Sequence, residues 1–212
     1  AIGEYPIQCA SMVSKVIRAF QRDEHDSEQF YPLDAVSLLT EPHGGQLVHR
    51  EASAADIADI DRLPHLAIAE KDLMDCEQFG YGTYSPLTGF MTRETLESVL
   101  YTNHLPNGEV WTLPILLQID AQRIEAFGPG DRIALTDEQG KVHSLLDVSE
   151  IYRYDLNSLA AQMFGTTSRN HPGVDRLMRR GDLFVAGDVT LVQPLEYPFR
   201  HYLYTPAQSR FI

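Results

Sequence analysis

Tyr84-Ser85-Pro86-Leu87-Thr88-Gly89-Phe90-Met91 is the stretch that decides the fold, together with Pro42-His43-Gly44-Gly45 earlier in the chain. Both stretches set glycine and proline beside small polar residues, a composition typical of tight turns. Gly44 and Gly45 are free to take backbone angles that are closed to other residues, so they predict a turn that leads into a strand. Ser85 lacks the Gly-x-Ser-x-Gly setting of a nucleophile elbow. We therefore interpret Ser85 and Pro86 as turn-forming residues rather than as an active site.

The composition is that of a soluble globular protein. The chain has 212 residues, of which 43% are hydrophobic and 22% charged. No stretch reaches the roughly 18 apolar residues that a membrane helix needs, and no signal-peptide pattern precedes the first helix. The formal charge of −13 repels phosphate backbones and so argues against general nucleic-acid binding. We therefore expect a cytoplasmic protein with no membrane or nucleic-acid partner, in which Cys9 and Cys76 are reduced and packed.

The first 41 residues differ in character from the rest. Residues 1–22 carry apolar side chains at the spacing of an amphipathic helix, which predicts a helical appendage at the N-terminus. Residues 23–41 begin with an acidic, polar run that offers nothing to bury, and we interpret them as a linker. The chain starts at Ala1 without a methionine, so we expect it to be a piece of a longer protein.

Residues 42–212 predict an α+β fold rich in strands. Frequent glycine and proline turns separate short apolar runs, which favours a small, partly closed barrel with peripheral helices over a regular α/β sheet. Helices are expected from Ser53 to before Pro64, at 70–79, after Thr92, and from Leu156 to before Gly165. Strands are expected at 66–69, 110–119 with Pro114 inside, 132–135, 141–148 and 183–192.

Sequence patterns that carry catalysis or bind metals are missing. A P-loop needs G-x-x-x-x-G-K-[ST], and Lys141, which follows a glycine, has no second glycine at that spacing upstream. Zinc sites use Cys or His pairs at short spacing, whereas the two cysteines lie far apart. Asp72, Asp75 and Glu77 follow the expected surface of a helix rather than forming a catalytic pair. We therefore predict no catalytic residue, no metal site and no cofactor in this chain.

His43, Arg169 and His171 are the candidate binding residues. His43 is held between a proline and two glycines, where its ring can bond a backbone group and fix the turn, or can contact a ligand. Arg169 and His171 lie in the run Arg169-Asn170-His171-Pro172, which can be interpreted as an anion-binding cluster or as a loop contact. In each case the sequence favours the structural alternative.

Several segments stand in a fixed order from residue 42 onward. In this order they resemble the N-terminal region of ATP sulfurylases (sulfate adenylyltransferases), and the resemblance covers residues 42–212. The segments are Pro42-His43-Gly44-Gly45-Gln46-Leu47-Val48-His49-Arg50, Asp75-Cys76-Glu77-Gln78-Phe79, Gly82-Thr83 with the opening stretch, Leu105-Pro106-Asn107-Gly108-Glu109-Val110-Trp111-Thr112-Leu113-Pro114-Ile115, Gly130-Asp131, His171-Pro172-Gly173-Val174, Ala186-Gly187-Asp188-Val189 and Tyr204-Thr205-Pro206-Ala207-Gln208-Ser209-Arg210.

That resemblance implies a PUA-like pseudo-barrel that is an accessory, non-catalytic domain. In the family this domain packs on a downstream catalytic domain and on neighbouring subunits. The family binds MgATP and sulfate through stretches that would lie beyond Ile212, and nothing in this chain matches them. The implied reaction of the longer protein is attack of sulfate on the α-phosphorus of ATP, which yields adenosine 5′-phosphosulfate and pyrophosphate.

The first segment resembles a different family. Gly3-Glu4-Tyr5-Pro6-Ile7 and the helix after it are similar to a helix in the C-terminal domain of pyruvate kinases, which implies a fusion joined at the acidic linker. Two alternatives to the accessory role stay open. PUA-like folds elsewhere bind RNA, although the charge of −13 disfavours this. The chain could also be a regulatory or oligomerisation module that binds a small anion such as sulfate.

Overall fold

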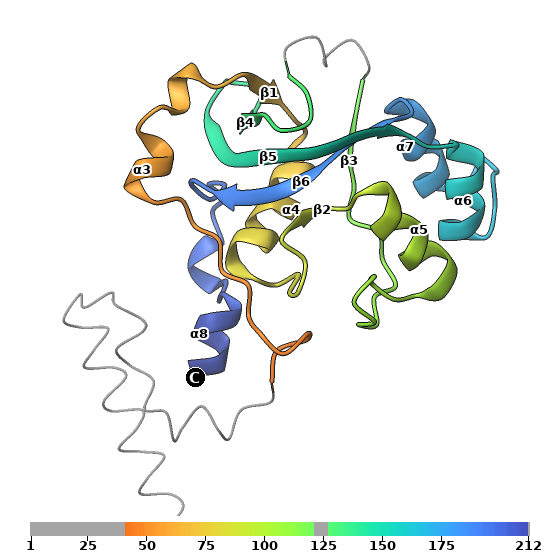
Figure 1. Cartoon of the computed structure of the whole chain (residues 1–212), viewed down its shortest axis with the longest axis horizontal. Helices are drawn as coiled ribbons and strands as arrows, with labels where there is room; N and C mark the ends of the chain where they lie inside the picture. Colours follow the sequence, from red (N-terminus) through yellow and green to blue (C-terminus); the bar gives the residue numbers. More distant parts are fainter. Residues whose placement is uncertain (1–40, 121–126, 212) are drawn as a thin grey trace, which may run out of the picture. The chain divides into compact units, whose positions relative to one another are not determined.

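The computed structural model describes residues 41–120 and 127–211 (Figure 1). The chain divides into two units, of which one is Pro42–Leu203 and the other contains Tyr204–Ile212. In the second unit, helix α8 (Pro206–Phe211) begins with reciprocal hydrogen bonds between Thr205 and Gln208, at 2.9 and 3.2 Å. The predicted helix at 1–22 and nearly all of the predicted linker at 23–41 lie outside the described residues.

A six-stranded mixed sheet organises the unit Pro42–Leu203. The strand order is β1-β4-β5-β6-β2, and β3 also pairs with β6; β1 runs parallel to β4 and the other pairs are antiparallel. The α+β class is therefore confirmed, but no described pairing joins β1 to β2 or β3, so the sheet is not closed into a barrel. The strands are β1 (His65–Ala67), β2 (Gly89–Phe90), β3 (Leu117–Ile119), β4 (Arg132–Thr136), β5 (Val142–Arg153) and β6 (Leu183–Leu191).

Local capping signals place the helices. Ser53 forms a capping box with Asp56, Thr92 accepts from Thr95 N–H, and each therefore starts a helix where the sequence predicts one. Gly165 ends α6 in the left-handed conformation, as expected of a glycine after the last apolar position. The helices of this unit are α3 (Ala54–Ile57), α4 (Glu70–Tyr81), α5 (Arg93–Thr102), α6 (Leu156–Phe164) and α7 (Pro172–Arg179), with 3₁₀ turns η2 (Ile60–Arg62) and η4 (Arg200–Tyr202).

Two predictions about local structure are wrong. The expected strand at 110–119 is reduced to β3, because Pro114 cannot donate to a ladder and Trp111 instead bonds Asn103 and Leu113 carbonyls. The expected loop around His171 begins α7, for which His171 is the N-cap and Pro172 the first residue. Proline suits that position because its missing N–H has no partner there anyway.

Gly89 and Gly187 let three strands approach closely. Gly89 pairs with Asp188, and a Cβ added to Gly89 would lie 1.9 Å from the Gly187 carbonyl oxygen. A Cβ added to Gly187 would lie 2.1 Å from the Asp147 carbonyl oxygen. Side chains at these positions would therefore separate β2 from β6 and β6 from β5.

Two apolar clusters form the core. In the larger cluster, side chains of α4 such as Leu73 and Phe79 pack with side chains of the sheet such as Ile133, Leu146 and Val185. Figure 1 shows α5, α6 and α7 gathered at the end of β5, where a smaller cluster lies. That cluster consists of Leu96, Tyr152, Leu159, Phe184 and Ala186.

Candidate functional site

The glycine turn at Pro42-His43-Gly44-Gly45 and the proline turn at Ser85-Pro86 meet near the C-terminal end of α4. A Cβ on Gly44 would lie 2.7 Å from Pro86 Cβ, so the glycine turn packs directly on the proline turn. Ser85 Oγ accepts from Val48 N–H at 2.9 Å and donates to the Gly82 carbonyl at 2.6 Å. Because Ser85 is buried and both bonds go to backbone, its hydroxyl joins the two turns and is not presented to a substrate.

His43 contacts a backbone group at the surface. Its Nε2 lies 2.8 Å from the Val110 carbonyl oxygen, and its ring centroid lies 6.1 Å from that of Trp111. Trp111 in turn meets Tyr84 edge-on at 6.4 Å. The His43 ring is exposed, and the contacts described here are all within the chain. Contact of His43 with a ligand therefore stays a prediction.

Arg169 and His171 lie at the start of α7. His171 Nδ1 accepts from Gly173 N–H at 3.2 Å, as a helix cap does. Arg169 donates to Asp175 Oδ1 from Nε at 3.1 Å and from Nη2 at 3.0 Å, and Arg179 Nε donates to Oδ2 at 2.7 Å. These bonds, that from Arg179 first, lower the pKa of Asp175. The Asp175 carboxylate thus fills the place where a bound anion would meet Arg169, and no described contact joins this cluster to His43.

Asp72 and Glu77 of α4 do not lie on an exposed helix surface, so the expectation that they do is wrong. Asp72 is 1% exposed and Glu77 is 3% exposed. Arg180 donates to both Asp72 oxygens, at 3.0 and 2.5 Å, and Arg200 Nη1 lies 3.2 Å from Glu77 Oε1. Both arginines follow more than 100 positions later in the chain, so no local signal on the helix announces either pair.

Asp75 and Cys76 are also packed inside. Tyr84 Oη donates to Asp75 Oδ1 at 2.8 Å, and burial raises the pKa of the Asp75 carboxyl despite this bond. Cys76 is fully buried with a free thiol, and burial raises the pKa of that thiol as well. A buried thiol of high pKa is a packing residue rather than a nucleophile. The prediction of a reduced, packed cysteine is confirmed for Cys76, while Cys9 lies outside the described residues.

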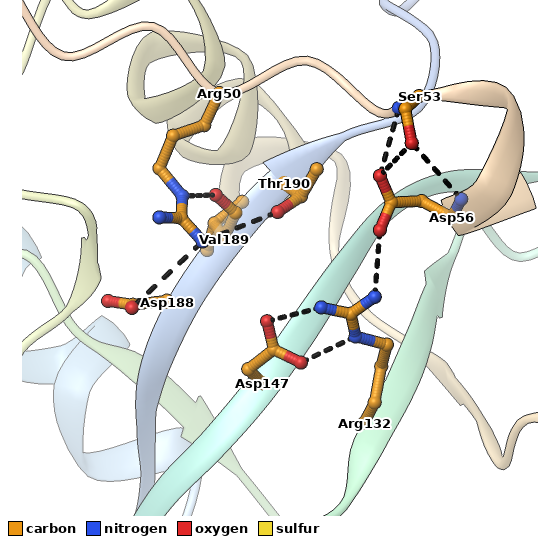
Figure 2. Close-up of polar contacts among 8 residues, drawn as sticks. All are labelled: Arg50, Ser53, Asp56, Arg132, Asp147, Asp188, Val189 and Thr190. Carbon is orange, nitrogen blue, oxygen red and sulfur yellow. Dashed lines mark hydrogen bonds and ion pairs between the residues drawn. The ribbon is translucent and has the colours of Figure 1, made fainter.

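Arg50 and Arg132 are each engaged by groups of the same chain (Figure 2). Arg50 Nε donates to a backbone carbonyl of β6 at 2.9 Å, and its Nη2 lies 3.9 Å from Asp188. Arg132 binds Asp147 through Nε and Nη2, at 2.5 and 2.9 Å, and Asp56 through Nη1 at 2.9 Å. Arginine forks suit phosphate or sulfate, but both are engaged within the chain here.

A shallow hollow of about 290 Å³ lies between β2, the loop 105–107 and β6. Its polar lining includes Thr88, which donates to Asp188 at 2.5 Å, and Ser149.

Within residues 41–120 and 127–211 no group of three or more His, Cys, Asp or Glu could hold a metal ion. In the same described part of the chain, no helix is long and apolar enough to cross a membrane.

The chain is similar to several curated sulfate adenylyltransferases. The chain is 41% identical over 174 residues to a sulfate adenylyltransferase of Synechococcus sp. (strain JA-3-3Ab) and 37% identical over 173 residues to that of Symbiobacterium thermophilum. It is 34% identical over 179 residues to the sulfate adenylyltransferase of Staphylothermus marinus. These alignments cover 80–82% of this chain but only 44–47% of each relative, so the chain spans about half the length of the curated relatives it matches.

A solved structure and a family model agree on the fold. The structure described as "Hexameric APS kinase from Thiobacillus denitrificans" is similar with a TM-score of 0.63 and 28% identity, over 81% of this chain and 31% of that one. These comparisons do not support the resemblance of the first segment to pyruvate kinases. Residues 40–194, more than half of the chain, match the model of the PUA-like domain, and the chain therefore belongs to the PUA-like domain family.

Proposed function

We propose that this chain is the accessory, non-catalytic domain of a sulfate-activating enzyme of the sulfate adenylyltransferase type. The observation that carries the proposal is its similarity to sulfate adenylyltransferases over only about half of their length. The reaction, in which sulfate displaces pyrophosphate from ATP, is then performed by the part of the protein outside this chain. MgATP binds there, and that part, with other subunits, is the partner of this domain.

The charge pairing of the described residues supports a structural role. A catalytic site needs ionisable groups that are presented to a substrate with perturbed pKa values. Here the carboxylates of Asp72 and Glu77 are buried against arginines, and Asp175 is shared by two arginines. Groups arranged in this way stabilise one packing of the chain and leave little to bind a transition state.

The proposal is tested by an assay of pyrophosphate release. The 212-residue chain and the full-length protein that contains it are each incubated with ATP, Mg²⁺ and sulfate, with omission of sulfate as the control. We expect turnover by the full-length protein and none by the chain alone. Sulfate-dependent turnover by the chain alone would overturn the non-catalytic assignment, and no turnover by the full-length protein would overturn the assignment of the longer enzyme.

The anion-binding alternative is addressed by ligand titration of the same chain. Because Arg169, Arg50 and Arg132 are engaged by carboxylates or backbone, we expect sulfate to leave the thermal midpoint unchanged relative to an equal ionic strength of chloride. A sulfate-specific rise that is abolished in His43→Ala would instead favour a regulatory anion site at the glycine turn.

A further inference from the structure

Residues 195–203, here called the strap, lie directly after the part of the chain that matches the PUA-like domain family. In the strap, Arg200 donates to Glu77 of α4, and Leu195 packs against the larger core cluster. Three other apolar side chains, Phe199, Tyr202 and Leu203, are exposed. This arrangement is the observation on which the inference rests.

Glu77 holds the inner side of the strap. Its carboxylate accepts from the Leu195 backbone N–H, from Tyr197 Oη at 3.4 Å and from Arg200 Nη1 at 3.2 Å. Arg200 also donates to the Leu195 carbonyl at 2.9 Å and to Tyr81 Oη at 2.6 Å. The guanidinium carbon lies 5.5 Å and 5.9 Å from the ring centroids of Tyr197 and Tyr81. A carboxylate that is 4% exposed is thus fully used in fixing this segment.

The outer side of the strap carries three large apolar side chains. Phe199 is 70% exposed, Tyr202 is 71% exposed and Leu203 is 57% exposed. Backbone bonds from Tyr202 N–H to the Phe199 carbonyl, at 3.0 Å, and from Leu203 N–H to the Arg200 carbonyl, at 2.9 Å, fix Tyr202 in η4 and Phe199 and Leu203 at its two ends. Their exposure therefore belongs to a held conformation and not to a frayed end.

The exposed apolar side chains lie in a part of the strap without acidic residues. The one acidic residue of the strap, Glu196, is paired with Lys141, and none lies between Tyr197 and Leu203. Isolated surface apolar residues need no explanation, but a cluster of aromatic and aliphatic side chains without charge is typical of the centre of a protein interface. Arg200, whose side chain is 33% exposed, is paired with the buried Glu77 carboxylate, so the segment places its paired charge toward α4 and leaves the three apolar side chains exposed.

We propose that Phe199, Tyr202 and Leu203 form the surface on which the remainder of the same polypeptide docks, and that the Glu77–Arg200 pair sets the position of that surface. This inference rests on the proposed function, because the occupant is the catalytic part of the longer enzyme. The relatives supply the reason for choosing that occupant, since more than half of each relative has no counterpart in this chain. Aromatic anchors of this kind commonly carry most of the energy of an interface.

Hydrogen exchange followed by mass spectrometry tests the proposal. The backbone amides of the strap are compared in the full-length protein and in the 212-residue chain, with the α5 peptide as the reference. We expect exchange at the strap to be slowed about tenfold or more in the full-length protein, and exchange in α5 to be unchanged. Equal exchange of the strap in the two proteins would overturn the proposal. Slowing in the chain alone that grows with its concentration would assign the surface to a second copy and would also overturn it.

Matched variants identify the side chains. Phe199→Ser, Tyr202→Ser and Leu203→Ser are combined in the full-length protein, and the control combines serine substitutions at three exposed apolar residues elsewhere, Ile57, Tyr101 and Leu113. We expect the strap variant to lose the slowed exchange and the control to keep it. Loss in both, or in neither, contradicts the assignment. Hydrogen exchange does not measure turnover. The docking surface and the proposed function can therefore be rejected separately, the first by exchange and the second by the pyrophosphate assay.

Discussion

Replacement of Gly89 by alanine is predicted to weaken the sheet at the crossing of β2 and β6. The added methyl carbon would lie 1.9 Å from the Gly187 carbonyl oxygen and 2.9 Å from Asp188 Cα, and both are backbone atoms that cannot rotate away. Overpacking in a core typically costs about 1–3 kcal/mol, and more where the obstacle is rigid. We therefore expect a loss of about 3 kcal/mol or more. For a protein of this size that corresponds to a fall in midpoint of roughly 6–12 °C.

Gly128→Ala provides the matched control, because a Cβ at Gly128 meets nothing within 4 Å. Thermal unfolding of the wild type and both variants is followed by circular dichroism under one set of conditions. The Gly128 variant should stay within about 0.5 kcal/mol of the wild type, as surface substitutions usually do. If Gly89→Ala unfolds at the wild-type midpoint, the close approach of the strands is not what requires glycine, and the reasoning fails.

Three further predictions concern the packed polar groups. Ser85→Ala removes the partner of the part-buried Val48 N–H and of the Gly82 carbonyl, and should lower the free energy of unfolding by about 1–3 kcal/mol in urea titrations; an unchanged midpoint would contradict the bridging role. Burial raises the pKa of Asp75, so the stability that this group confers is present at low pH and is lost as the pH rises above its unfolded value of about 3.9. Asp75→Asn, which can still accept from Tyr84, should therefore be at least as stable as the wild type at pH 7, and a large loss there that vanishes at pH 3 would refute this sign. Finally, the Cys76 thiol should resist a thiol reagent in the native protein and react after denaturation, as peptide mapping can show; rapid native labelling would contradict its burial.

Features that depend on near neighbours in sequence could be predicted. Thr92 starts α5 and Gly165 ends α6 as expected, because a cap acts within one turn of its helix. The hairpin of β4 and β5 was also predicted, since a glycine-containing turn separates two apolar runs. By contrast, the contact of the glycine turn with Pro86 was not predictable, because it joins positions far apart in the chain.

Features that depend on distant partners could not be predicted. Asp72 and Glu77 look like surface residues until Arg180 and Arg200 are placed beside them. Periodicity also cannot show that the Trp111 N–H bonds to the Asn103 carbonyl instead of to a neighbouring strand. The prediction of binding residues was affected most. The sequence offers Arg169 as an anion ligand, but the structure shows that its guanidinium donates to Asp175.

The residues by which this chain is most easily recognised are those that the backbone needs. Gly89 is required where two strands touch, and Ser85 joins two turns through backbone bonds. Such positions identify a fold but present nothing outward, so a role must be sought among side chains that the fold leaves uncovered. Phe199 and Tyr202 are the most exposed of the large apolar residues in the described unit. The buried Glu77 carboxylate pairs with Arg200, which lies between them in the chain. If Glu77→Gln lets the strap exchange freely in the isolated chain while α4 stays protected, then the pair positions the strap; if both loosen together, Glu77 serves only the stability of the core.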